Sequence, residues 1–270
     1  MSQLIQLKQR LTAIETIKKI TSAMRVISMS MHSRLENKLE NLEEYKTQIN
    51  EILLIIKKAS TNLAEPEENK SEKKLLIIVG SDKGLCGPFN SAIVKLIKQQ
   101  DYSGYDIITV GKKITDNVKK KLNIKESFNG FTYKSLHRIS ADLYAIIESA
   151  NYDEVICIST FPKNFFVQIA HKKTLLPIKE KIENHKINIE QYIWEENPEE
   201  IYRSLKKEYL KFSISLMLFE SLSAEQAARF QSMDSATRNA ENILEQMQIQ
   251  YSKLRQAKIT QEINELTSHI

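Results

Sequence analysis

Apolar residues recur in steps of three and four along the first part of the chain. The stripe runs through Leu4, Leu7, Leu11, Ile14, Ile17, Ile20, Met24, Ile27, Met31, Leu35, Leu39, Leu42, Tyr45, Ile49, Ile52 and Ile56. Such steps place side chains on one face of an α-helix. Because no glycine or proline occurs before Pro66, the pattern predicts one uninterrupted helix over residues 1–65.

A second stripe lies near the other end of the chain. It comprises Phe230, Met233, Thr237, Ala240, Leu244, Met247, Tyr251 and Leu254, close to a strict heptad. This spacing favours a left-handed coiled coil. The predicted helix covers residues 197–270: Asn197 can cap it, Pro198 suits the first helical position, and Glu199 and Glu200 lie where the helix dipole favours carboxylates.

The two helices are expected to pair with each other. Helices of about 60 and 70 residues span roughly 90 and 105 Å, too long to be buried in the middle of this chain, so they must pack on each other or on partners. The simplest arrangement is an antiparallel, intramolecular coiled coil. An ordinary helical bundle is the alternative, but it needs turn residues that both segments lack.

Residues 66–196 have a different pattern, in which short β-branched runs alternate with helical stretches. Strands are predicted over 75–79, 106–110 and 154–159, with a further pair over 164–176 and 186–194; helices are predicted after Pro88, capped by Asn90, and over 112–122 and 140–150, with an irregular piece around Gly130. Such alternation predicts a small, mostly parallel α/β sheet. The fold class is therefore α+β: an α/β domain at 66–196 flanked by helices at 1–65 and 197–270.

Composition narrows the possible functions. The net charge of +5 is a mild excess with interleaved signs, unlike the basic patch of a nucleic-acid binder. Cys86 and Cys157 lie far apart, which favours reduced thiols, and the five histidines have no metal-ligand spacing. No apolar run has the length of a membrane span, and the N-terminus has no apolar signal-peptide core. We therefore expect a chain that is soluble or held at a membrane by partners.

One turn invites an enzymatic interpretation. The segment GSDKGLCG at 80–87 lies between a strand and a helix, as phosphate-binding turns do, so nucleotide binding there is an alternative. It lacks the GKS/T ending and the GxGxxG spacing, and Pro88 removes an amide donor. Structural glycines at a sharp turn explain it better. We identify no catalytic, cofactor-binding or metal-ligating residue.

Four segments together carry a resemblance to a known family. They are IETIKKITSAM at 14–24, GSDKGLCG at 80–87, ESLSAEQAARF at 220–230 and RQAKITQEI at 255–263. In order and spacing they resemble the gamma subunit of F-type ATP synthase. The resemblance covers essentially the whole chain and is weakest between about residues 100 and 190.

The resemblance implies a central rotor shaft that couples transmembrane proton flow to ATP synthesis, or hydrolysis, at the beta subunits. The implied partners are the alpha and beta subunits of the catalytic head, the epsilon subunit and the membrane ring of c subunits, with one copy of the shaft per complex. It also implies a non-catalytic subunit without cofactors, held peripherally at the cytoplasmic face of the bacterial inner membrane. A coiled-coil scaffold or tether without a rotary role is the alternative.

The resemblance also implies roles for individual residues. Arg255 and Gln256 match a pair that engages a loop of the beta subunits, and Thr260 and Glu262 match positions that brace the two helices. Met24 and Arg229 match a pair that face each other where the shaft leaves the head.

The chain departs from the family at three places. Arg25 stands where the family usually has an acidic or polar residue, and with Arg34 it is expected to compensate for an altered basic stretch; Pro88 replaces a glycine. A regulatory dithiol insertion is absent, so redox control is not expected.

Overall fold

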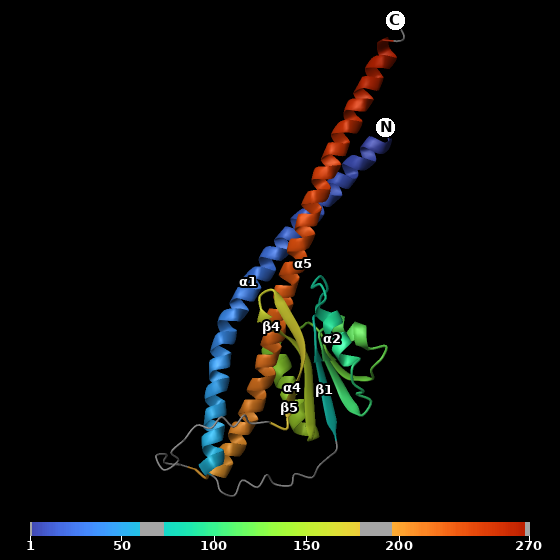
Figure 1. Cartoon of the computed structure of the whole chain (residues 1–270). Helices are drawn as coiled ribbons and strands as arrows, with labels where there is room; N and C mark the ends of the chain where they lie inside the picture. Colours follow the sequence, from blue (N-terminus) through green and yellow to red (C-terminus); the bar gives the residue numbers. More distant parts are fainter. Residues whose placement is uncertain (1, 60–72, 179–195, 268–270) are drawn as a thin grey trace. The chain divides into compact units, whose positions relative to one another are not determined.

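A computed structural model describes residues 2–59, 73–178 and 196–267 of the chain (Figure 1). The elements, in order, are α1 (Ser2–Ala59), β1 (Lys74–Val79), α2 (Phe89–Ile97), β2 (Tyr105–Val110), α3 (Lys112–Val118), β3 (Ile124–Phe128), α4 (Leu136–Ala150), β4 (Glu154–Asn164), β5 (Val167–Leu176) and α5 (Pro198–Thr267). They form two compact units, Met1–Ser30 with Arg229–Ile270, and Met31–Ala228. Helices α1 and α5 contribute to both units. The predicted fold class, two long antiparallel helices with a mostly parallel α/β sheet, is confirmed.

The unit Met31–Ala228 contains one sheet with the strand order β3-β2-β1-β4-β5. Strands β1, β2, β3 and β4 are parallel neighbours, and only β5 is antiparallel, paired with β4. Strand β3 was not predicted, because its sequence IKESF is largely exposed at the sheet edge and lacks a β-branched run. Helix α4 begins at Leu136 rather than at residue 140, and β4 extends five residues beyond the predicted end at residue 159.

The sheet separates two hydrophobic cores. Alternate residues of β1 point to opposite faces, as the pleat requires: Leu75, Ile77 and Val79 belong to one core, and Leu76 and Ile78 to the other. The first core is completed by residues of α1, α4 and α5, and the second mainly by residues of α2 and α3. In Figure 1 the segment of α5 beside the sheet runs behind β4 and β5. The near-continuous apolar run of β1 thus reflects burial on both faces.

One packing expectation is wrong. Parts of the two long helices are buried against the α/β sheet and do not pack only on each other. Helix α5 contributes Leu210, Ile214, Leu216, Met217, Leu218, Phe219 and Leu222 to the first core, and α1 contributes Leu35 and Leu39. A helix segment that is apolar around its whole circumference must be covered on several sides.

The division of the chain into segments 1–65, 66–196 and 197–270 stays a prediction.

In the unit Met1–Ser30 with Arg229–Ile270, the α5 seam is confirmed. Met233, Thr237, Ala240 and Leu244 are buried. The α1 stripe is partly wrong: Ile17, Ile20 and Ile27 are exposed, and the buried positions follow a strict seven-residue repeat through Leu7, Thr21 and Ser28. The apolar stripe takes two successive steps of three, from Ile14 to Ile17 and on to Ile20. Its members from position 17 to 27 therefore stand one residue before the positions of the buried repeat and leave the seam.

The helix caps were predicted with mixed success. Asn197 does cap α5, because its Oδ1 accepts a hydrogen bond from the Glu199 amide at 3.1 Å. Asn90 does not cap α2: it lies inside the helix, and its Oδ1 accepts from the Ser81 amide at 3.0 Å while its Nδ2 donates to Ser81 Oγ at 2.6 Å. Asn90 therefore fixes the turn after β1 instead of the helix start.

Two sequence predictions fall outside the described residues: the strand over 186–194 and the end of the first helix near Pro66. Among the residues that the structure does describe, none of the helices combines the length and the hydrophobicity that a membrane crossing requires.

Candidate functional site

The residues proposed to contact a partner lie near the end of α5. Arg255 and Gln256 are both exposed, and three apolar residues that follow them, Ile259, Ile263 and Leu266, are exposed as well. Exposed large apolar side chains at spacings of four and three form a stripe on one helix face. This end of α5 therefore offers a guanidinium, an amide and an apolar stripe to a partner.

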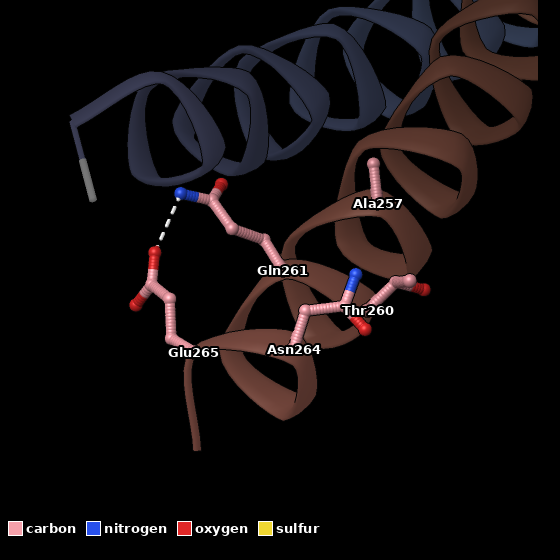
Figure 2. A pocket seen from close by; sticks show the side chains of 5 residues that line it. All are labelled: Ala257, Thr260, Gln261, Asn264 and Glu265. Atoms are coloured by element: carbon pink, nitrogen blue, oxygen red, sulfur yellow. Dashed lines mark hydrogen bonds between the residues drawn. The ribbon is translucent and has the colours of Figure 1, made fainter. Parts of the chain in front are cut away.

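An open depression of about 650 Å³ lies on the same part of α5, lined by Ala257, Thr260, Gln261, Asn264 and Glu265 (Figure 2). In Figure 2 the side chains of Gln261 and Glu265 turn toward each other, and Gln261 Nε2 donates to Glu265 Oε1 at 2.8 Å. The described part of the chain holds no group of three histidine, cysteine, aspartate or glutamate side chains able to bind a metal ion.

Thr260 and Glu262 interact within α5 itself. The Thr260 hydroxyl donates to the Gln256 carbonyl at 3.0 Å, and the Glu262 carboxylate lies 3.4 Å from Lys258 Nζ one turn earlier. The ion pair one turn apart supports the helix locally, whereas the threonine hydroxyl, bonded to the carbonyl four residues earlier, adds no helix stability. Their bracing role toward α1 stays a prediction, as does the contact of Arg255 and Gln256 with a beta subunit.

Met24 and Arg229 are each half-buried. The expectation that their side chains face each other also stays a prediction.

Arg25, the residue beside Met24, makes a contact that sequence reasoning missed. The Arg25 guanidinium donates to Asp234 Oδ1 at 2.8 Å, and Arg238 Nη2 lies 2.7 Å from Asp234 Oδ2. The hydrogen bond from Arg25, with the nearby charge of Arg238, holds the pKa of Asp234 below its ordinary value. Arg25 thus has a partner within its own chain.

Two more polar pairs join α1 and α5, and both lie on the N-terminal side of Arg25 along α1. Thr237 Oγ1 bonds to Thr21 Oγ1 at 2.9 Å in a buried position, and Lys18 Nζ lies 3.1 Å from Glu241 Oε1. Together with Arg25 and Asp234 these pairs form the polar seam. A signal for the seam exists in the sequence: Lys18, Thr21 and Arg25 follow the same steps of three and four as the apolar residues. Polar groups inside a coiled coil fix its register and orientation.

The start of the turn at 80–88 is closely packed against protein atoms. A Cβ at Gly80 would lie 2.4 Å from Ile114 Cβ, so this glycine permits close packing of a side chain rather than of a ligand. The amides of Lys112 and Gly130 both donate to Asp82 Oδ1, at 3.2 and 2.7 Å. Because Asp82 already occupies these donors, the geometry does not support the nucleotide-binding alternative.

His32, Ser223 and Glu36 have the residue types of a catalytic triad, but a substrate cannot reach the serine hydroxyl. His32 Nδ1 lies 3.0 Å from Ser223 Oγ, and His32 Nε2 lies 3.2 Å from Glu36 Oε2. Ser223 is fully buried, and the His32 ring packs against Phe165 with centroids 4.9 Å apart. The hydroxyl cannot meet a substrate, so the cluster serves to join α1, α5 and the β4–β5 hairpin.

The fold and the site define a class: this is a protein with two paired long helices and an α/β unit. Its candidate site is an exposed helix surface with an open depression. A family model described as ATP synthase matches residues 3–269. The ATP synthase gamma chain of Christiangramia forsetii is 30% identical over 282 residues, covering 98% of this chain and 97% of that one. The gamma chain of Geobacter metallireducens is 26% identical over 280 residues, covering 99% and 98%. This chain therefore belongs to the ATP synthase gamma chain family.

Solved structures share the fold. The Euglena gracilis mitochondrial ATP synthase rotor in rotational state 1 contains a chain that superposes with a TM-score of 0.67 at 14% identity, covering 96% of this chain and 99% of that one. The central stalk and c-ring structure from Tetrahymena thermophila contains another, with a TM-score of 0.58 at 22% identity, covering 80% and 99%. At these identities the likeness establishes the fold alone.

Proposed function

We propose that this chain is the central rotor shaft of an F-type ATP synthase, coupling transmembrane proton flow to ATP synthesis or hydrolysis at the beta subunits. The observation that carries the proposal is the family match over residues 3–269, which includes both long helices. The partners are the alpha and beta subunits of the catalytic head, the epsilon subunit and the c-subunit ring.

The shaft acts by mechanical coupling and carries out no bond chemistry itself. An asymmetric pair of helices presents a different face to each beta subunit as it turns, and each orientation favours a different set of open and closed conformations through its contacts. Exposed Arg255 and Gln256 are suited to such a contact, because a guanidinium and an amide make directional hydrogen bonds that break and re-form at each step.

We place the chain at the cytoplasmic face of the bacterial inner membrane, held there by its partners. Two observations support this placement. No helix among the described residues is able to cross a membrane, and the gamma chains of Christiangramia forsetii and Geobacter metallireducens, 30% and 26% identical to this chain, come from bacteria.

The test is co-expression of the chain with alpha and beta subunits. The purified chain alone is expected to hydrolyse no ATP, and the three chains together are expected to yield a soluble ATPase that contains this chain. Robust ATP turnover by the chain alone, or self-association without any binding of the head subunits, would contradict the proposal.

Within that complex, Arg255→Ala with Gln256→Ala is expected to lower the torque, or the rate of coupled turnover, because the directional contact with the beta subunit is lost. Rotation under load separates torque from chemistry. The matched control is Lys253→Ala, another exposed side chain of the same helix. Unchanged rotation under load in the double variant would show that these residues are not the contact.

A further inference from the structure

A half-buried group of charged side chains lies where α1 meets the sheet in the unit Met31–Ala228. This charge cluster consists of Lys46 of α1, Lys173 of β5 and Glu220 of α5. Lys173 Nζ lies 3.9 Å from Glu220 Oε2, and the two side chains are only 24% and 15% exposed. Lys46 is half-buried as well and interacts with both of them. Two lysines therefore share one carboxylate at a place where little water screens their charges.

The titratable groups around the charge cluster do not correct this imbalance. Cys157 is paired with Lys173 across the two antiparallel strands, and burial raises the pKa of its thiol to about 12, so the thiol stays neutral. Burial and the charge of Lys173 lower the pKa of His171, so its ring is neutral at neutral pH. Glu43, one turn earlier on α1, is exposed and attracts Lys46 less than the carboxylate of the cluster does. An excess of positive charge remains.

This arrangement favours a neutral amine at Lys46. Burial, and after it the charge of Lys173, lowers the pKa of Lys46 from its ordinary value of 10.5, and the two nearby carboxylates only partly oppose this effect. A hydrogen bond between the two lysine side chains acts in the same direction, because one amine must be neutral in order to accept it. A lysine amine that is desolvated beside another cation is an activated nucleophile.

We propose that Lys46 is a site of acylation by a small acyl phosphate. The lone pair of Lys46 Nζ attacks the carbonyl carbon of the acyl phosphate and forms a C–N bond. The bond from that carbon to the phosphate oxygen breaks, the phosphate leaves with the electron pair, and the amine proton passes to solvent. The product is an amide, which carries no charge.

The charge cluster suits this class of donor. Its excess positive charge attracts the phosphate group, and the phosphate can leave as an anion beside Lys173. Lys46 keeps part of its surface in contact with solvent, so a small donor can reach the amine. Acylation leaves Lys173 and Glu220 as one cation with one carboxylate. The repulsion between α1 and β5 at this point is then removed.

The test compares the rates at which individual lysines of the full chain are acetylated near neutral pH. Acetyl phosphate is the probe, and peptide mass spectrometry measures the modified fraction at Lys46, Lys173 and Lys19 early in the reaction. Lys19 is the matched control, because it is an exposed lysine of the same helix. Lys46 is expected to react at least about 3-fold faster than Lys19, since each unit by which a pKa falls raises the neutral fraction of an amine about 10-fold.

Two variants separate the effect of charge from the effect of access. Lys173→Met removes the neighbouring cation and is expected to slow acetylation of Lys46 at least about 2-fold, whereas Glu220→Gln removes the carboxylate and is expected to speed it by about the same factor. A structure loosened by substitution would instead expose Lys46 and speed the reaction in both variants.

Three results would overturn the inference: equal rates at Lys46 and Lys19, faster reaction of Lys173 than of Lys46, or a change in the same direction in both variants. The proposed rotor function does not depend on any of them, because the charge cluster lies within this chain alone.

Discussion

At the residue scale, the helix pair is held together by polar groups at positions where a coiled coil usually has leucine or isoleucine. Arg25 and Thr21 of α1 meet Asp234 and Thr237 of α5, and the threonine pair is buried. Such pairs contribute specificity more than stability, because each loses hydration when the helices meet.

The pairing of Arg25 with Asp234 is testable by a double-mutant cycle. Arg25→Met and Asp234→Ala are each expected to lower the midpoint of thermal unfolding, because each leaves a half-buried charge without this partner. The double variant is expected to lose less than the sum of the two. Asn239→Ala, another exposed side chain of the same helix, is the control. Additive losses would show that the pair does not contribute.

A second residue-scale prediction concerns pH. Burial, with the charge of Lys173 nearby, lowers the pKa of His171 from its ordinary value of 6.5. Between the lowered pKa and 6.5 the unfolded chain binds more protons than the folded one, so stability rises with pH through that window. The contribution of neutral His171 to the free energy of unfolding is complete above pH 6.5 and is lost as the pH falls below that value.

His171→Gln, which cannot titrate, is expected to flatten this part of the curve of unfolding free energy against pH. Carboxyl groups with lowered pKa values, such as Asp106 and Asp234, act in a separate window below about pH 4. Urea unfolding between pH 5 and 8 measures the effect. Identical curves for the wild-type chain and His171→Gln would contradict it.

At the scale of elements, hydrogen bonds to the Asp82 side chain link three loops at the carboxyl ends of the parallel strands. Its carboxylate lies in the turn after β1 and accepts amide hydrogen bonds from the start of α3, at Lys112, and from the loop after β3, at Gly130. These loops lie at the same edge of the sheet because β1, β2 and β3 are parallel. One side chain therefore fixes the relative positions of all three.

Asp82→Ala is expected to destabilise the protein by about 1–3 kcal/mol, since two amides lose their acceptor. Asp82→Asn keeps an oxygen in the same place and is expected to recover much of the loss. Urea unfolding of the three chains measures both effects. Equal stability of all three chains would mean that solvent replaces the carboxylate without cost.

The sequence predicted the elements that bury the most apolar surface. Both long helices and strands β1 and β2 follow from uninterrupted periodicity or from β-branched runs. Strand β3 was missed because sheet pairing, and not its composition, makes it a strand. The phase of α1 was missed because its apolar residues lie on two faces, the buried seam and an exposed face that carries Ile17, Ile20 and Ile27. Arg255 and Gln256 were found by resemblance alone, since both are exposed and periodicity cannot distinguish them from any helix surface.

At the scale of the whole molecule, α1 and α5 are each continuous from one compact unit into the other. In the unit Met31–Ala228 they are buried with the sheet, and in the other unit they pair through the polar seam. A turning force applied to the α/β unit can therefore pass along two unbroken backbones. The proposed rotor function requires this continuity.

The most direct test of the central claim is to watch the chain turn. The head is immobilised through its beta subunits, and a probe is attached to this chain through a cysteine introduced at an exposed position of the α/β unit, such as Lys95. On addition of ATP, the account predicts sustained rotation of the probe in one direction at a rate that follows ATP hydrolysis. Hydrolysis at full rate with a stationary or randomly fluctuating probe would contradict it.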